Sequence, residues 1–310
     1  MYKEHYGFRE NPFSLTPDPA FLYLSKQHKL ALTLLLYGIE SKAGVSLITG
    51  EVGSGKTTII RELLHKIDDS FTVGLISNIH NSFGDLLQWI LMAFDIKSDE
   101  MNKASRYKVL VDFLVNEYSE NKRTILIIDE AQNMDVQTLE ELRLLSNINV
   151  DKHFIFQLIM VGQPELLEMM HRRELRQFAQ RVSVDYSLAH LNYKETSDYI
   201  KHRLSVAGAE YAIFDKYAIA IVFYHSGGIP RLINTLCDFA LVYGFAENRL
   251  HVNLSLMMDV VRDKQKGGIF PMITHENREQ SEIRELIKKA KNVDIMPEFV
   301  EAEITKAIKL

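Results

Sequence analysis

The chain has 310 residues, of which 46% are hydrophobic and 25% are charged, as is typical of a globular protein with about two domains. Its net charge of −5 excludes a general attraction of the whole chain to nucleic acid, but it does not exclude a local basic patch that binds nucleic acid. The single cysteine, Cys237, excludes an intrachain disulfide and suits a reducing compartment. No stretch has the apolar core of a signal peptide or the roughly 20 apolar residues of a membrane span, so we expect a cytoplasmic protein without a transmembrane segment.

The amino-terminal part of the chain, residues 1–26, is rich in proline and aromatic residues. We expect it to form an extended segment, pinned by Phe8, Phe13, Phe21 and Tyr23, rather than a regular element. A helix is predicted over about residues 27–40. The apolar and β-branched run at 45–49 then predicts a short buried strand.

The stretch after this strand, GEVGSGKTT, matches the phosphate-loop pattern G-x-x-x-x-G-K-[ST]. Its glycines let backbone N–H groups turn toward anionic oxygens, and the helix that follows offers the positive end of its dipole to the same charge. Lys56 is expected to reach the β- and γ-phosphates, and the Thr57 hydroxyl to bind Mg²⁺. A chance glycine-rich turn would lack the strand before it and the helical spacing after it. The predicted nucleotide-binding residues are Gly50, Glu51, Val52, Gly53, Ser54, Gly55, Lys56, Thr57 and Thr58.

Buried strands and amphipathic helices then alternate along the chain. Strands are predicted at 71–76, 125–128, 154–161 and 182–186, and helices at about 83–94, 107–118 and 136–146. This alternation predicts the α/β fold of a P-loop NTPase, with a parallel sheet flanked by helices and the ligand at the carboxyl ends of the strands.

Two acidic residues follow the apolar strand at 125–128. Asp129 is in the position of an aspartate that holds Mg²⁺ directly or through water, so Thr57 and Asp129 form the predicted metal site. Glu130 is expected to polarise the attacking water as general base. An acidic base is typical of ATPases, whereas GTPases often orient the water with a glutamine, so ATP and Mg²⁺ are the predicted ligands. The alternative is a solvated acidic turn.

If the protein works as a ring or filament of identical subunits, three further polar residues are expected to complete the site. Gln163, at the end of the strand at 154–161, would help to place the water, unless it is only a turn residue before a proline. Arg231 begins a helix, where an arginine is poorly placed for the helix dipole, and this favours a role in reaching the phosphates. Arg181 is favoured over Arg176 as an arginine finger given to a neighbouring subunit, with a solvated basic surface as the alternative.

The pattern becomes entirely helical after Ala189. Asn192 and Glu195 are spaced as a helix capping box, and two further helices are predicted at about 216–225 and 230–244. We therefore expect a nucleotide-binding α/β domain at 27–189, a small all-helical lid domain at 190–265 and a polar helical tail at 266–310.

Together these motifs resemble the AAA+ ATPases of the group typified by general secretion pathway protein A (ExeA-like). The resemblance extends over residues 1–262 and is carried by the stretches YGFRENPFSLTPDPAFLYLS, GEVGSGKTT, LIIDEAQNM, VGQPEL, RQFAQRV and GGIPRLINTLCDFAL. It implies an ATP-hydrolysing homo-oligomer. In that family pattern Gln163 corresponds to sensor 1, Arg231 to sensor 2 and an arginine near Arg181 to the finger.

Secretion proteins of this group continue into a transmembrane helix and a peptidoglycan-binding module, whereas this sequence ends in a polar tail, so we do not expect direct cell-wall remodelling. Shorter relatives serve pilus or polysaccharide export, and related transposon target selectors (TniB-, TnsC- and MuB-like) assemble on DNA. The expected role is an ATPase, peripheral to the inner membrane through its partners, that drives or regulates assembly of an envelope machine. The alternatives are an ATPase that binds duplex DNA through Arg172, Arg173 and Arg176, and a nucleotide-gated scaffold that hydrolyses slowly.

Overall fold

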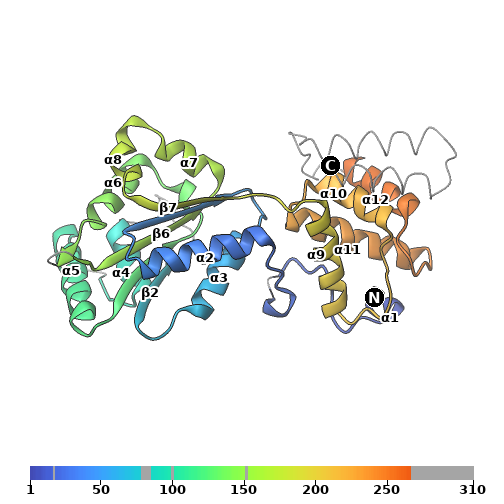
Figure 1. Cartoon of the computed structure of the whole chain (residues 1–310), viewed down its shortest axis with the longest axis horizontal. Helices are drawn as coiled ribbons and strands as arrows, with labels where there is room; N and C mark the ends of the chain where they lie inside the picture. Colours follow the sequence, from blue (N-terminus) through green and yellow to red (C-terminus); the bar gives the residue numbers. More distant parts are fainter. Residues whose placement is uncertain (17, 78–84, 99–100, 151–152, 267–310) are drawn as a thin grey trace. The chain divides into compact units, whose positions relative to one another are not determined.

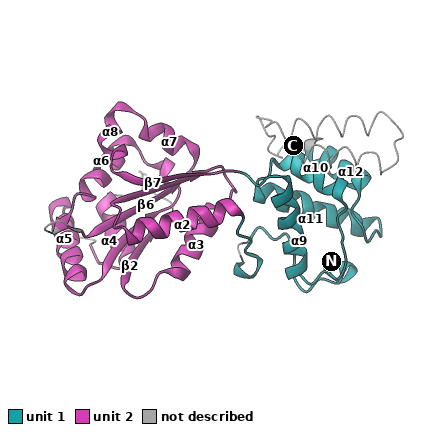
Figure 2. Ribbon diagram, viewed as in Figure 1, with its two compact units in different colours: residues 1–25, 190–310 teal, residues 26–189 magenta. Residues whose placement is uncertain are grey.

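The computed structural model describes residues 1–16, 18–77, 85–98, 101–150 and 153–266. The chain divides into two compact units (Figure 2). One unit is Lys26–Ala189, and the other joins Met1–Ser25 to the chain from His190 onward. The predicted helical tail at 266–310, apart from Lys266, lies outside the described residues.

A five-stranded sheet forms the centre of the unit Lys26–Ala189 (Figure 1). Its strands lie in the order β2-β3-β6-β1-β7, and every neighbouring pair is parallel. The strands are β1 (Val45–Gly50), β2 (Phe71–Ile76), β3 (Arg123–Ile128), β6 (Phe156–Gly162) and β7 (Val182–Leu188). The predicted α/β fold with a parallel sheet is therefore confirmed.

Helices cover both faces of this sheet. Alternate side chains of a strand point to opposite faces, and both sets are apolar in the central strands, so both faces must be covered. In β3, Ile125 and Ile127 belong to one core, whereas Leu126 and Ile128 belong to another. The helices of the first core are α2 (Lys26–Glu40) and α3 (Lys56–Lys66), and those of the second are α4 (Leu86–Ala93), α5 (Lys103–Ser119), α6 (Val136–Leu145), α7 (Pro164–Met170) and α8 (Arg176–Ala179). This arrangement leaves the carboxyl ends of the strands free to carry a site.

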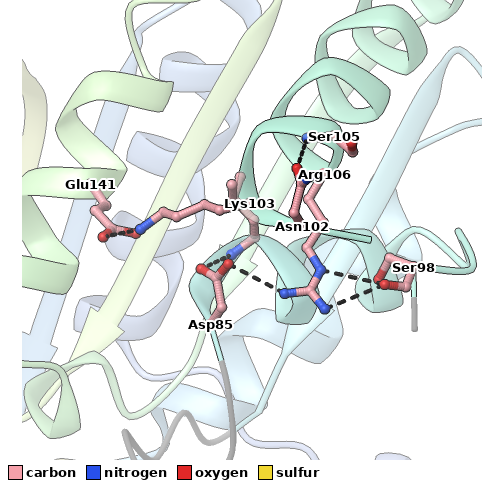
Figure 3. Close-up of polar contacts among 8 residues, drawn as sticks. Asp85, Ser98, Asn102, Lys103, Ser105, Arg106 and Glu141 are labelled. Carbon is pink, nitrogen blue, oxygen red and sulfur yellow. Dashed lines mark hydrogen bonds and ion pairs between the residues drawn. The ribbon is translucent and has the colours of Figure 1, made fainter. Parts of the chain in front are cut away.

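Polar contacts hold α4, α5 and α6 together (Figure 3). Asp85 and Asn102 are the N-caps of α4 and α5, and their side chains accept hydrogen bonds from backbone N–H groups of the first turns. The guanidinium of Arg106 lies 3.5 Å from the Asp85 carboxylate, and Lys103 Nζ lies 2.6 Å from a carboxylate oxygen of Glu141 on α6. The cap at Asn102 explains why α5 begins before the start predicted at residue 107.

Two short antiparallel strands precede β6 and were not predicted. They are β4 (Asn149–Val150) and β5 (His153–Phe154). The apolar run predicted as one strand at 154–161 is thus divided, because Phe154 is 43% exposed whereas every residue of β6 is buried.

The second unit contains four longer helices after His190, namely α9 (Tyr193–Val206), α10 (Lys216–Ser226), α11 (Pro230–Ala246) and α12 (Leu254–Lys266). The predicted capping box is present, because the Asn192 side chain accepts from the Glu195 N–H at 2.8 Å and the Glu195 side chain accepts from the Asn192 N–H at 3.1 Å. The sequence pattern did not predict α12. None of the helices within the described ranges is both long enough and apolar enough to cross a bilayer.

The expectation that residues 1–26 lack regular structure is wrong in detail. The structure forms a short helix, α1 (Tyr2–Tyr6), and a 3-10 turn, η1 (Pro19–Phe21). The aromatic side chains of the segment are buried in the core of the helical unit: Tyr2, Tyr6, Phe8, Phe13 and Phe21. This burial orders the segment, so residues 1–25 pack as part of the helical unit rather than as a separate extended arm.

Candidate functional site

The predicted site lies where three adjacent strands end. β6 pairs with β1 on one side and with β3 on the other, so their carboxyl ends share one edge of the sheet. The loop at residues 50–55 begins at the last residue of β1, and Gly55 is the N-cap of α3 with a φ of +101°. Such a left-handed conformation favours glycine, and it turns the chain directly from strand into helix.

Close packing explains the first glycine of this loop. A Cβ on Gly50 would lie 2.9 Å from Ser54 Oγ and 3.2 Å from the Leu188 carbonyl oxygen. A side chain at this position would therefore displace the loop backbone from β7. The hydroxyl of Ser54 is itself buried and has no hydrogen-bond partner within the described residues. The loop thus contains a polar atom and backbone N–H groups suited to an anion.

Lys56 is almost fully buried at the start of α3, with 5% of its surface exposed. Its ammonium donates to the carbonyl oxygens of Gly50, at 2.7 Å, and Glu51, at 3.0 Å. Burial lowers the pKa of Lys56, and the negative charges of Glu130 and Asp129 partly oppose this effect. The lysine is therefore a cation held inside the phosphate loop, beside two carboxylates.

Thr57 and Asp129 are brought together from different elements. Thr57 Oγ1 donates to Asp129 Oδ2 at 3.0 Å, and Asp129 Oδ1 accepts from the backbone N–H of Glu130 at 2.9 Å. The carboxylate is 6% exposed. A hydroxyl and a carboxylate are hard oxygen donors, and Mg²⁺ is commonly bound by one or two such groups together with substrate phosphates. The residues present therefore fit the predicted metal.

Glu130 adopts a left-handed conformation, with φ 53° and ψ 38°, directly after the buried Asp129. Its Oε2 accepts hydrogen bonds from two amides, Gln132 Nε2 at 2.6 Å and Gln163 Nε2 at 3.2 Å. The Gln132 side-chain oxygen accepts in turn from the backbone N–H of Gln163 at 2.9 Å. Sequence reasoning gave Gln132 no role, although it stands in the DEAQ stretch two residues after Glu130.

The surroundings of Glu130 act on its pKa in opposite directions. Burial raises the pKa, whereas the Gln132 and Gln163 amides and the charge of Lys56 lower it, and the net result is a pKa below the usual value. Glu130 is therefore held as a carboxylate, the form that a general base requires.

Arg181 lies far from the phosphate loop of its own chain. It immediately precedes β7, whose first residue, Val182, pairs with Val45 at the amino end of β1. The phosphate loop follows Gly50 at the other end of β1, roughly 17 Å away at about 3.3 Å per residue. An arginine side chain cannot span this distance, so Arg181 does not contact the phosphate loop of its own chain.

The remaining arginines lie at two other places. Arg231 is exposed near the start of α11 and belongs to the helical unit, and its predicted role stays a prediction. Arg172, Arg173 and Arg176 are exposed on η4 (Arg173–Leu175) and at its two ends. The structure thus brings Lys56, Thr57, Asp129, Glu130 and Gln163 together, and it does not bring Arg181 to them.

Comparison with known proteins identifies the family. Residues 39–170 match the family model described as an AAA domain. General secretion pathway protein A of Aeromonas hydrophila is 38% identical over 260 residues, which make up 83% of this chain and 48% of that protein. The chain belongs to the AAA+ ATPase group typified by general secretion pathway protein A. It spans about half the length of this relative, at 48%.

Solved structures share the fold of this AAA+ protein at low sequence identity. Cdc6p of Pyrobaculum aerophilum has a TM-score of 0.64 at 15% identity, covering 96% of this chain and 83% of that one. The Aeropyrum pernix ORC2 protein in ADPNP-ADP complexes gives 0.61 at 18% identity, with 97% and 84% covered. Drosophila ORC bound to DNA gives 0.60 at 12% identity, with 95% and 76% covered. These likenesses confirm the predicted AAA+ fold with a helical region after the sheet.

Proposed function

We propose that this AAA+ protein binds and hydrolyses MgATP at the carboxyl ends of β1, β3 and β6. The observation that carries the proposal is the convergence of a buried lysine, a hydroxyl–carboxylate pair and an amide-held glutamate on one edge of the sheet. Each group has the chemistry that one part of phosphoryl transfer to water requires.

The work of the chain's own residues follows from their positions. Lys56 supplies positive charge to the phosphates, and the backbone N–H groups of the loop fix their orientation. Thr57 and Asp129 would hold the metal, which would supply positive charge to offset that of the phosphates. Glu130 accepts a proton from the attacking water at its carboxylate, and Gln163 is placed beside Glu130 to orient that water.

Replacement of Lys56 by alanine tests nucleotide binding most simply. The variant should lose binding of a fluorescent ATP analogue, because no other described cation of the phosphate loop replaces its charge. Lys66→Ala is the matched control, since Lys66 is on the same helix but is half-exposed and pairs with Glu62 at 3.6 Å. Unchanged affinity in Lys56→Ala, with an unchanged melting temperature, would disprove the proposed site.

Hydrolysis is proposed to require a homo-oligomer, either a ring or a filament. This proposal starts from the expectation that Arg181 is an arginine finger, and Arg181 lies at the opposite end of β1 from the phosphate loop of its own chain. A role for Arg181 in catalysis therefore needs a second copy whose site receives the guanidinium. An arginine supplied in this way stabilises charge in the transition state.

The proposed biological role is to power or regulate assembly of a secretion, pilus or polysaccharide-export machine. It is supported by the 38% identity to general secretion pathway protein A over 83% of this chain. Affinity capture from native membranes, using Glu130→Gln protein in ATP and Lys56→Ala protein as the control, tests this role. Enrichment of envelope-assembly components with Glu130→Gln alone is expected, and equal recovery with both variants would contradict it.

A second candidate function is ATP-dependent binding of duplex DNA. It is favoured by the exposed arginines Arg172, Arg173 and Arg176, which lie close together around η4. Fluorescence anisotropy of a labelled duplex at low salt, with Glu130→Gln protein in ATP, tests it. Binding that disappears in Arg172→Glu with Arg173→Glu, and that weakens steeply with salt, would support this function. If the duplex does not bind at micromolar protein, the DNA-binding function is rejected and the envelope role is the remaining candidate.

A further inference from the structure

A histidine outside the predicted site contacts the phosphate loop. His28 lies on α2 and is 4% exposed, and its Nε2 is 2.9 Å from the carbonyl oxygen of Ser54. A carbonyl oxygen can only accept a hydrogen bond, so Nε2 carries the proton and donates. The contact links α2, which precedes β1 along the chain, to the phosphate loop, which follows β1.

The imidazole also lies against the next residue. A Cβ on Gly55 would be 2.6 Å from His28 Nε2, and the φ of Gly55 is +101°. The glycine therefore both permits the left-handed turn and leaves room for the ring. A side chain at position 55 would press on the imidazole and push it away from the Ser54 carbonyl.

Peptide geometry gives this contact a consequence for nucleotide binding. The C=O and N–H groups of a planar trans peptide point in opposite directions, so an anchored Ser54 carbonyl also sets the direction of the Gly55 N–H. That N–H is at the amino-terminal end of α3, and because the Ser54 carbonyl points toward His28, the N–H must point away from it. Without the anchor, the peptide between Ser54 and Gly55 could rotate through its two flanking dihedrals and turn the N–H away from an anion.

We propose that His28 is a positioning residue that fixes the Gly55 N–H for a nucleotide phosphate by holding the Ser54 carbonyl. The inference rests on the proposed function, because it names a further residue that prepares the same phosphate-binding loop. The proposed role concerns binding of the phosphates rather than the transition state, so loss of the bond should raise KM for ATP and leave kcat nearly unchanged.

Two substitutions of His28 separate this role from simple packing. The amide nitrogen of glutamine reaches about as far along the side chain as Nε2 of histidine, whereas that of asparagine reaches only as far as Nδ1. His28→Gln can therefore still donate to the Ser54 carbonyl, and His28→Asn cannot. Leu32→Ala is the control for a loss of packing, because Leu32 is buried on the same helix and its change removes only apolar contacts.

The experiment measures KM and kcat for MgATP, the dissociation constant of a fluorescent ADP, and the melting temperature without nucleotide. In His28→Asn, we expect KM and the ADP dissociation constant to rise roughly tenfold, as for the loss of a buried hydrogen bond. His28→Gln should stay within about threefold of wild type. Leu32→Ala should lower the melting temperature while its KM stays near that of wild type.

Each other outcome overturns the proposal in a recognisable way. Wild-type affinity in both His28 variants would show that the anchor does not position the loop. Equal weakening in both would show that only the imidazole packing matters. If the wild-type protein itself binds no nucleotide, the proposed function fails first. If wild type binds and the Asn and Gln variants do not differ, only the role of His28 fails.

Discussion

Gln163 and Glu130 follow different strands, yet Gln163 Nε2 lies 3.2 Å from Glu130 Oε2. They meet because β6 and β3 are adjacent and parallel, and both residues come just after the carboxyl ends of these strands. Gln132 closes the arrangement by donating to Glu130 and accepting from the backbone of Gln163. Glu130, the proposed base, is therefore oriented by the side-chain amides of Gln132 and Gln163, and it is not simply part of a solvated acidic turn.

Removal of the Gln132 amide should change the pH dependence of hydrolysis. Burial raises the pKa of Glu130, and the two amides and Lys56 lower it further than burial raises it. Gln132→Ala removes one of the lowering contacts, so the pKa of Glu130 should rise. The carboxylate is the active form, and hydrolysis should therefore fail at a higher pH than in wild type as the solution is acidified. A kcat–pH profile checks this prediction.

The same variant should also lower kcat at neutral pH by roughly ten- to a hundredfold, because the glutamate loses its orientation. Gln137→Ala, the same change at an exposed glutamine of α6, is the matched control and should leave the profile in place. An acid limb that stays at the wild-type pH in Gln132→Ala would show that this amide does not govern the protonation of Glu130.

Mixed oligomers test the proposed role of Arg181. Arg181→Ala and Glu130→Gln should each lose hydrolysis, by roughly 10³-fold or more for the finger. A mixture should regain part of the activity, because some interfaces then pair an intact arginine with an intact glutamate. Steady-state ATPase rates across mixing ratios give the answer. A mixture that assembles and stays inactive would remove Arg181 from the site.

Gly228→Ala should strongly destabilise the helical unit. Gly228 has a φ of +75°, its carbonyl accepts from the Leu191 N–H at 3.0 Å, and a Cβ would lie 1.9 Å from the Leu191 carbonyl oxygen. The expected cost is about 3 kcal/mol or more, from backbone strain together with a clash against main chain. Urea unfolding measures it.

Gly7→Ala is the control for the Gly228 substitution, because Gly7 has a similar φ of +73° and nothing within 4 Å of its Cβ position. Its cost should be about 1 kcal/mol, which represents backbone strain alone. Equal costs at the two positions would show that the contact with Leu191 relaxes freely.

Arg203 should be essential for docking the amino-terminal segment. Its buried guanidinium donates to the Pro12 carbonyl, to the Ser14 carbonyl at 3.2 Å and to the Tyr199 hydroxyl at 2.9 Å. Arg203→Ala leaves these acceptors without their donor, and we expect a loss of about 2–4 kcal/mol in the free energy of unfolding. Arg203→Lys should restore little, because an ammonium cannot reproduce the planar fork.

Chemical denaturation of the Arg203 variants, compared with the exposed Lys201→Ala on the same helix, checks this expectation. Lys201→Ala should stay within about 0.5 kcal/mol of wild type. Stability of Arg203→Lys equal to that of wild type would contradict the account.

The sequence predicted the sheet and the centre of the site because both depend on local patterns. Uninterrupted apolar runs such as residues 125–128 identify central parallel strands. The spacing of glycine, lysine and threonine in GEVGSGKTT identifies the turn from strand to helix in a phosphate loop. The pairing of Thr57 with Asp129 followed from the rule that parallel strands end at one edge of the sheet.

Other features depend on contacts between distant parts of the chain, and local patterns do not contain them. Arg203, which lies far along the chain, adds a contact to Pro12 to the aromatic burial that orders the amino-terminal segment. The contact between His28 and Ser54 joins a helix before β1 to the loop after it, and the two residues are 26 positions apart. No local sequence pattern around His28 therefore indicated this contact. Gln132 was visible beside Glu130, but its role required the hydrogen bond from Gln163.

The most direct test of the account is the comparison of ATP binding and ATP hydrolysis in Glu130→Gln and wild type. Glutamine keeps the shape of the side chain and leaves Lys56, Thr57 and Asp129 in place, but it cannot accept the proton from water. The account predicts that Glu130→Gln binds ATP with wild-type affinity and hydrolyses it at least about a hundredfold more slowly. Equal hydrolysis by the two proteins would show that Glu130 is not the base and would contradict the proposed mechanism.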